Sequence, residues 1–314
     1  MSTNVFELTR PQYRGFRTTV VVLTGLITLL GTLNAKRLVA QSLIADGAEL
    51  QLISDDYKFT EGPAADSEGN VFFTDQPNDR IMKYSVSGKL ETWLKPAGRS
   101  NGLFFKQDGT LIACADGKNE LWAIAPNKQP TVLAKGFEGK LFNGPNDVWV
   151  APDGALYFTD PFYKRDYWQR KSSQPELPRR VYRLSQDLET LTVAAEGFKQ
   201  PNGIVGDPER GELYVADIGD KKTYRFKIGP QGDLIDRTLF CEQGSDGMTL
   251  DQDRNLYLTG KGVMIFDKSG KLKEKIEVPE GWTANVCFGG RKKDVLFITA
   301  MDSLYSIKMR TRGM

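Results

Sequence analysis

The chain contains no histidine among its 314 residues. This absence excludes Ser–His and Cys–His nucleophile pairs, histidine general bases and His-based zinc sites. Any chemistry must therefore rest on carboxylates, amides, hydroxyls, Lys, Arg or a bound metal. The chain also lacks a strong net charge, which is +2, and it has no basic stripe long enough to follow a phosphate backbone. We therefore expect no nucleic-acid partner.

Cysteine is scarce as well, and the chain has three of them, Cys114, Cys241 and Cys287. They are far apart in sequence, and each lies within an apolar run. We interpret all three as buried thiols that pack as small hydrophobic side chains, and a single disulfide is the alternative.

An uncharged segment near the N-terminus differs from the rest of the chain. Residues 19–33 carry no charge, and Arg10, Arg14 and Arg17 precede them. This length is short for a membrane-spanning helix and typical of the apolar core of a signal peptide. We predict that residues 1–40 form a signal peptide and that residues 41–314 are the folded body of an exported protein, periplasmic or extracellular. The alternative is a retained anchor that holds the protein on a membrane through residues 19–33.

A short pattern recurs six times and sets the expected fold: a turn, then an apolar run that ends in Thr-Asp or a related pair. The copies are SEGNVFFTD, QDGTLIACAD, PDGALYFTD, ERGELYVAD, QDRNLYLTG and KKDVLFITA, ending at Asp75, Asp116, Asp160, Asp217, Gly260 and Ala300. An inner strand precedes each copy, and further apolar strands follow it. Four short strands in a repeat of about 40–45 residues describe one blade of a β-propeller. The longest interval holds a polar insertion at 164–178, which we interpret as a loop.

The sixth copy has no outer strand after its second strand at 303–308. Residues 50–55 (LQLISD) precede the first copy and have no other role there. We expect them to fill the vacant edge of the last blade, which would close the ring and remove an exposed strand edge. The predicted fold is therefore all-β, a six-bladed β-propeller with four antiparallel strands per blade, closed by an N-terminal strand.

Polar residues occupy the same place in all six repeats. Counting back 14 or 15 residues from each repeat end reaches the start of the inner strand, at Glu61, Asn101, Asn146, Asn202, Asp246 and Asn285. In a propeller these positions face the central channel near one mouth. Asx residues also suit the turn before a strand, but that preference explains neither Glu61 nor the complete set.

A ring of oxygen-bearing side chains without His or Cys favours a hard cation. Glu61 and Asp246 would neutralise a divalent ion, while Asn146 and Asn202 would add amide oxygens. Calcium accepts such a mixed set with loose geometry, so it is the expected ion, and Zn²⁺, Mg²⁺ and Mn²⁺ are alternatives. Without a cation the two carboxylates would repel each other.

The ordered motifs of these repeats resemble one known family. They are EGP at 61–63, PNDV at 145–148, FTDP at 158–161, PNGI at 201–204, SDGM at 245–248 and NVCFGG at 285–290. The chain is similar over about residues 50–310 to the superfamily of senescence marker protein (regucalcin), gluconolactonase and luciferin-regenerating enzyme. The resemblance implies a six-bladed propeller with one metal in the channel, bound by Glu61, Asn146, Asn202 and Asp246.

The resemblance also implies hydrolysis of a sugar-acid lactone, a small-molecule substrate. In this interpretation the metal polarises the lactone carbonyl and Asp246 assists the attack of water. Two alternatives are a non-catalytic propeller that binds a ligand or protein around a structural Ca²⁺, and a related metal-dependent esterase or phosphotriesterase.

Several residues are expected to contact the substrate or to be structural. Relatives of the regucalcin type have a substrate-contacting Arg where this chain has Gly144, so Arg99 is a candidate replacement. Asn101 and Tyr163 are further candidates for substrate binding, and the insertion that follows Tyr163 would cap the mouth. We expect Asn285 to be a structural strand start, the tryptophans Trp93, Trp122 and Trp149 to be blade core, and the strand-end residues Asp75, Asp160 and Asp217 to bind backbone amides.

Overall fold

The computed structural model describes residues 41–170 and 172–314. The predicted signal peptide or anchor at 1–40 lies outside this range. Within it, no helix is long and apolar enough to cross a membrane. The helical segments described are two short 3-10 turns, η1 (Gln76–Asn78) and η2 (Asp116–Lys118).

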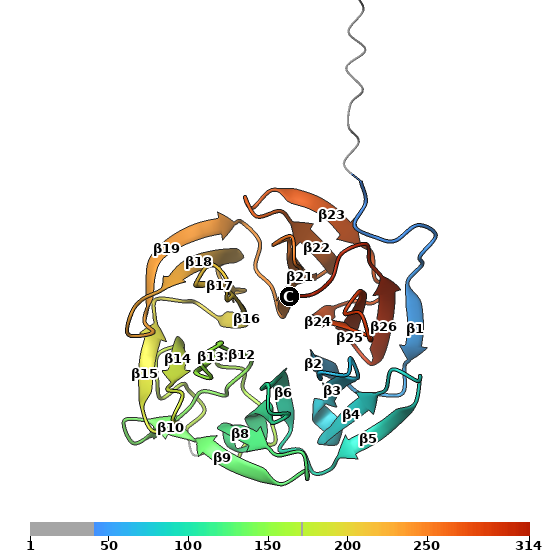
Figure 1. Cartoon of the computed structure of the whole chain (residues 1–314). Coiled ribbons are helices and arrows are strands. Elements are labelled where there is room, and N and C mark those ends of the chain that lie inside the picture. The colour runs from blue at the N-terminus through green and yellow to red at the C-terminus, as the bar shows by residue number, and fades with distance from the viewer. Residues whose placement is uncertain (1–40, 171) are drawn as a thin grey trace, which may run out of the picture. The chain divides into compact units, whose positions relative to one another are not determined.

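The described chain forms six four-stranded antiparallel sheets arranged as blades around a central channel, which confirms the predicted propeller (Figure 1). From the channel outwards, the first three blades are β2 (Thr60–Ala65), β3 (Val71–Asp75), β4 (Arg80–Tyr84), β5 (Leu90–Leu94); β6 (Ser100–Phe105), β7 (Leu111–Ala115), β8 (Glu120–Ile124), β9 (Pro130–Ala134); and β12 (Val148–Val150), β13 (Leu156–Asp160), β14 (Arg180–Leu184), β15 (Leu191–Ala195). The next three are β16 (Pro201–Asp207), β17 (Glu212–Asp217), β18 (Lys222–Ile228), β19 (Leu234–Cys241); β20 (Met248–Leu250), β21 (Leu256–Gly260), β22 (Gly262–Phe266), β23 (Leu272–Ile276); and β24 (Thr283–Gly289), β25 (Val295–Ala300), β26 (Ser303–Lys308), β1 (Gln51–Ser54). A small hairpin of β10 (Gly136–Phe137) and β11 (Lys140–Leu141) was not predicted.

The ring is closed by the predicted N-terminal strand. Strand β1 pairs antiparallel with β26, with Gln51 opposite Ser306 and Leu52 opposite Tyr305. The last blade is thus built from both ends of the propeller, and β26 has no free edge. Figure 1 shows β1, in blue, beside the red strands of this blade.

The core consists of apolar clusters between neighbouring blades. Between blades 1 and 2, for example, Phe72 packs with Leu103 and Leu111. Trp149 is buried in the cluster of blades 3 and 4, while Trp93 and Trp122 are partly buried against the core. All three cysteines are free and buried, as predicted. These clusters fix each blade against the next and hold the inner strands around the channel.

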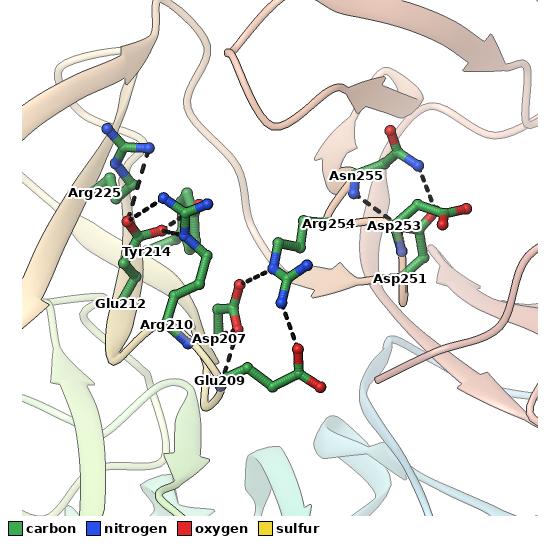
Figure 2. Close-up of polar contacts among 10 residues, drawn as sticks. All are labelled: Asp207, Glu209, Arg210, Glu212, Tyr214, Arg225, Asp251, Asp253, Arg254 and Asn255. Atoms are coloured by element: carbon green, nitrogen blue, oxygen red, sulfur yellow. Dashed lines mark hydrogen bonds and ion pairs between the residues drawn. The ribbon is translucent and has the colours of Figure 1, made fainter.

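One ion-pair network joins blades 4 and 5 (Figure 2). Arg254, in the turn before β21, donates from Nε to Asp207 Oδ2 at 2.7 Å and also pairs with Glu209. The side chain of Asp207 is 1% exposed and that of Arg254 is 27% exposed. Arg254 therefore supplies the counter-charge for a buried carboxylate of the neighbouring blade.

We expect Arg254→Ala to lower the melting temperature by roughly 2–5 °C, because Asp207 would stay buried without its ion-pair partner. Glu209→Ala is the matched control, since it removes only the exposed partner of the same arginine, and its effect should be smaller. Thermal unfolding followed by circular dichroism measures both. Equal melting temperatures for the two variants would show that the Asp207 pair does not stabilise this junction.

Residues at the C-terminal end cross one mouth of the channel. Gly313 pairs with Asp251, and the Met314 amide donates to the Leu250 carbonyl. Figure 1 shows this end at the centre of the ring. Met314 also lines a cavity of about 210 Å³ together with Asp147, Ile204 and Asn285. Of the six polar positions predicted from the repeats, Asn285 borders this cavity, and the other five do not line it.

Candidate active site at the channel mouth

The structure places all six predicted polar positions at, or just before, the start of an inner strand. Glu61, Asn101, Asn202 and Asn285 lie within β2, β6, β16 and β24, whereas Asn146 and Asp246 lie two residues before the first residues of β12 and β20. Five of the side chains are buried, and Asp246 is partly buried. Figure 1 shows β2, β6, β16 and β24 surrounding the channel.

The threonine of the repeated Thr-Asp ending links one blade to the next. Thr159 donates from Oγ1 to the Asn202 carbonyl at 2.7 Å, and its backbone carbonyl accepts from the Asn146 amide at 2.9 Å. Thr74 donates in the same way to the Asn101 carbonyl at 3.2 Å. These buried bonds fix the backbone of each polar residue relative to its neighbours, so the repeat motif itself positions the site.

A glycine after the polar residue lets adjacent inner strands come close together. A Cβ on Gly102 would lie 2.4 Å from Asp147 Oδ1, and one on Gly247 would lie 1.8 Å from Asn285 Cγ. Neither position has room for a side chain. The glycines of the SNG and SDG motifs thus allow side chains of the next blade to reach the channel axis.

Asp246 is held by two donors at the mouth. Asn202 Nδ2 donates to its Oδ1 at 2.7 Å, and Trp282 Nε1 donates to its Oδ2 at 2.6 Å. Burial raises the pKa of Asp246 to about 6, although both donors favour its charged form. Asn202 Nδ2 also donates to the Tyr163 hydroxyl at 2.8 Å. The structure therefore brings three predicted residues, Asn202, Asp246 and Tyr163, into direct contact.

Glu61 lies on the inner strand of blade 1, and blade 6 separates it from Asp246 of blade 5. The Glu61 carboxylate accepts from the Gly62 amide and from Asn285 Nδ2, the latter at 3.1 Å. Burial raises the pKa of Glu61 well above its usual range, and the charges of Asp246 and Asp147 raise it further. Asp147 is also buried, which raises its pKa to about 7. Three carboxyl groups therefore converge on the channel, and the charge of Asp246 disfavours ionisation of both Glu61 and Asp147.

Unpaired amide oxygens complete the polar ring. Asn101 Oδ1 and Asn202 Oδ1 are buried and have no donor among the described residues. The Asn146 side chain is buried too, and its side-chain amide group makes no hydrogen bond within the described residues. No group of three or more His, Cys, Asp or Glu side chains with metal-site geometry occurs in residues 41–170 and 172–314. The ring instead offers carboxylates mixed with carbonyl oxygens that lack donors, a donor set that fits a hard divalent cation.

The two remaining sequence predictions concern Arg99 and Gly144. The Arg99 guanidinium donates to the Pro77 carbonyl at 2.9 Å and stacks on Tyr167, with 4.5 Å from Cζ to the ring centroid. At Gly144, which has φ +136°, a Cβ would lie 2.7 Å from Asp116 Oδ1 and 3.0 Å from Trp168. Asp116 and the indole of Trp168 therefore fill the space in front of Gly144.

Two participants were missed or misassigned from the sequence. Trp282 lies just before β24 and contacts Asp246, but it belongs to no repeated motif, so no periodic signal marks it. Asn285, expected to be purely structural, donates to Glu61 while its Oδ1 accepts from the Val286 amide. Its position in the ring of six was the signal that it shares the site. Asp75, Asp160 and Asp217 accept backbone amide hydrogen bonds, as predicted.

The fold and this site define a class: a six-bladed propeller whose channel mouth carries buried carboxylates and carboxamides. Residues 59–302 match the model of the SMP-30/Gluconolactonase/LRE-like region, and the chain belongs to this family. A gluconolactonase of Zymomonas mobilis subsp. mobilis is 28% identical over 293 residues, which cover 84% of this chain and 82% of the relative.

Two solved structures are similar along most of the chain. A putative gluconolactonase superimposes with a TM-score of 0.80 at 31% identity, covering 87% of this chain and 96% of the other. A gluconolactonase of Xanthomonas campestris has a TM-score of 0.79 at 29% identity, covering 85% and 91%. The resemblance inferred from the ordered motifs is thereby confirmed.

Proposed function

We propose that this chain is a metal-dependent lactonase that hydrolyses a sugar-acid lactone at the channel mouth. The gluconolactonase relatives support the lactonase class. The observation that carries the proposal is the pair of carboxylates at the channel, the buried Glu61 and the partly buried Asp246, with the donorless Asn202 oxygen beside Asp246. Ionising both carboxylates costs free energy unless a positive charge lies between them. The same positive charge would polarise a lactone carbonyl.

We propose that Glu61, Asn146, Asn202 and Asp246 hold one divalent cation, most simply Ca²⁺. Two negative charges and two neutral amide oxygens match its charge and its preference for oxygen ligands. Zn²⁺, Mg²⁺ and Mn²⁺ are the alternatives to be compared. Asn101, on the inner strand β6 of blade 2, also has a side-chain oxygen without a donor. Because it is not one of the proposed cation ligands, this oxygen is available to the substrate.

A cation bound in this ring supplies Lewis-acid polarisation of the lactone carbonyl. Asp246 accepts the proton of the attacking water as the general base. Trp282 and Asn202 hold the two carboxylate oxygens in place, so the lone pairs that remain have a fixed direction. The ring C–O bond breaks, and the proton passes to the leaving alkoxide, which gives the open hydroxy acid.

We further propose that the protein is exported, periplasmic or extracellular. The support is the uncharged segment 19–33 with three arginines before it. Retention of that segment would instead leave the propeller anchored to a membrane.

A substrate panel tests the proposed function. We expect the purified protein to hydrolyse glucono-δ-lactone with a kcat/KM at least about 100-fold above its values for an aryl ester and a phosphotriester, because the site would select the lactone. A pH-stat or pH-indicator assay measures all three substrates. A preference for the phosphotriester or aryl ester would assign the site to the related esterase class. No turnover of any substrate by metal-loaded protein would favour a binding protein with a structural ion.

A further inference from the structure

The segment after β13 is fastened to the neighbouring blade through one aspartate. Asp116 ends the Thr-Asp-like repeat of blade 2, but its carboxylate accepts from the side chains of this segment. Arg165 Nε donates to Asp116 Oδ2 at 3.0 Å and the Tyr167 hydroxyl donates to the same oxygen at 2.6 Å. Trp168 Nε1 donates to the Asp116 carbonyl at 2.8 Å. Residues 165–168 are therefore held on blade 2, beside Gly144 of blade 3.

Arg165 uses only part of its guanidinium in this arrangement. Nε is bonded to Asp116, whereas Nη1 and Nη2 have no hydrogen-bond partner among the described residues. The side chain is 26% exposed, so these donors are partly withdrawn from water. A guanidinium fixed at one edge and free at the other is suited to binding an acceptor group of a ligand.

Arg165 lies at the channel mouth that contains the candidate site. Its Cζ lies 5.5 Å from the centroid of the Tyr163 ring, and the Tyr163 hydroxyl bonds to Asn202. Arg99, the arginine expected from the sequence, instead stacks on Tyr167 and donates to the Pro77 carbonyl.

We propose that Arg165 is a substrate-binding residue that donates from Nη1 and Nη2 to hydroxyl or carboxylate oxygens of a polyhydroxylated lactone and its acid product. The identity of this substrate class rests on the proposed lactonase function. Asp116 positions the arginine, and Trp168, which donates to the Asp116 carbonyl, fills the space in front of Gly144. An unsubstituted lactone offers no oxygen beyond its ester group and would leave these donors unpaired, so Arg165 selects for hydroxylated rings.

Arg165→Gln tests this assignment with two substrates, glucono-δ-lactone and δ-valerolactone. We expect kcat/KM for the hydroxylated lactone to fall roughly 10- to 100-fold, mostly through KM, while the value for δ-valerolactone stays within about threefold. Arg165→Lys should recover part of the loss, because it keeps the charge but not the planar fork. Lys164→Gln is the matched control: it removes one exposed charge from the adjacent residue and should change neither substrate. Equal losses on both lactones, or no loss on either, would overturn the proposal.

A binding measurement separates this inference from the proposed function. Titration of gluconate, followed by tryptophan fluorescence, should show a Kd about 10-fold weaker in Arg165→Gln than in wild type or Lys164→Gln. If the wild type hydrolyses no lactone but shows this difference, the lactonase function fails and the role of Arg165 stands. An unchanged Kd in Arg165→Gln overturns the role of Arg165 whether or not the wild type is active.

Discussion

Asp246→Asn is expected to lower kcat for lactone hydrolysis by about 10²- to 10⁴-fold, the usual contribution of a general base. Asparagine has nearly the same shape and keeps one acceptor oxygen, so the fold and part of the cation affinity should remain. The substitution removes the group that accepts the proton of water. Steady-state kinetics with saturating Ca²⁺ measures the loss, and Asp55→Asn, at an exposed position, is the matched control.

The pH profile distinguishes a base from a residue that only shapes the site. Burial raises the pKa of Asp246 to about 6, and a bound cation would lower it. Because a base acts only when deprotonated, wild-type kcat/KM should fall as the pH drops through a value at or below about 6. The residual activity of Asp246→Asn should lack this acid limb. Turnover within about threefold of wild type in Asp246→Asn would remove Asp246 from the mechanism.

Removal of the cation should lower the lactonase activity about as strongly as Asp246→Asn does. We expect EGTA to reduce kcat/KM at least about 100-fold and added Ca²⁺ to restore it, because the carbonyl would lose its polarising charge. Glu61→Gln should require a higher Ca²⁺ concentration for half-maximal activity, since it removes one of the two negative ligands. Glu49→Gln, on the exposed surface, is the matched control. Full activity after chelation, with no metal found by elemental analysis, would contradict the metal-dependent mechanism.

The stability of the metal-free protein should depend on pH in a direction set by the same carboxylates. Burial raises the pKa of Asp246 to about 6 and raises that of Glu61 as well. The folded state therefore holds these protons more tightly than the unfolded chain does, and stability falls as the pH rises from about 4 through these raised values.

Calcium would replace those protons, so its stabilising effect should grow as the pH rises. At 100 times Kd, a ligand adds about 2.7 kcal/mol to the free energy of unfolding. We expect the Ca²⁺-induced rise in melting temperature, measured by differential scanning fluorimetry, to be larger at pH 7.5 than at pH 5. A rise that is equal or larger at pH 5 would show that the cation does not bind at Glu61 and Asp246.

Much of the architecture could be predicted from the sequence because a propeller repeats itself. The Thr-Asp endings recur at near-constant spacing, so they gave the number of blades, and the leftover strand at 50–55 identified the closure with β26. The same counting located the polar positions from Glu61 to Asn285. The closing strand β1 is one residue shorter at each end than the predicted 50–55, because hydrogen bonding rather than hydropathy decides where a strand stops.

The contacts within the site could not be predicted in the same way. Trp282 and Asp246 come from two different blades, and no pattern in the sequence links the two positions. The insertion read as a loop at 164–178 gave no sign that Arg165 and Tyr167 would bond to Asp116, because that contact depends on how neighbouring blades are placed. The sequence shows that Gly144 replaces the arginine of regucalcin-type relatives. The structure adds that Trp168 packs against this glycine, so no side chain would fit there.

The sequence alone determined the propeller, its closure and the identity of the residues around the channel, because periodic burial and turn chemistry are local properties that a repeat displays six times. The tertiary structure decided which of those residues touch, which amide oxygens lack donors and which arginine reaches the mouth. Those properties depend on distances between blades, and such distances are set by packing among residues far apart in the chain.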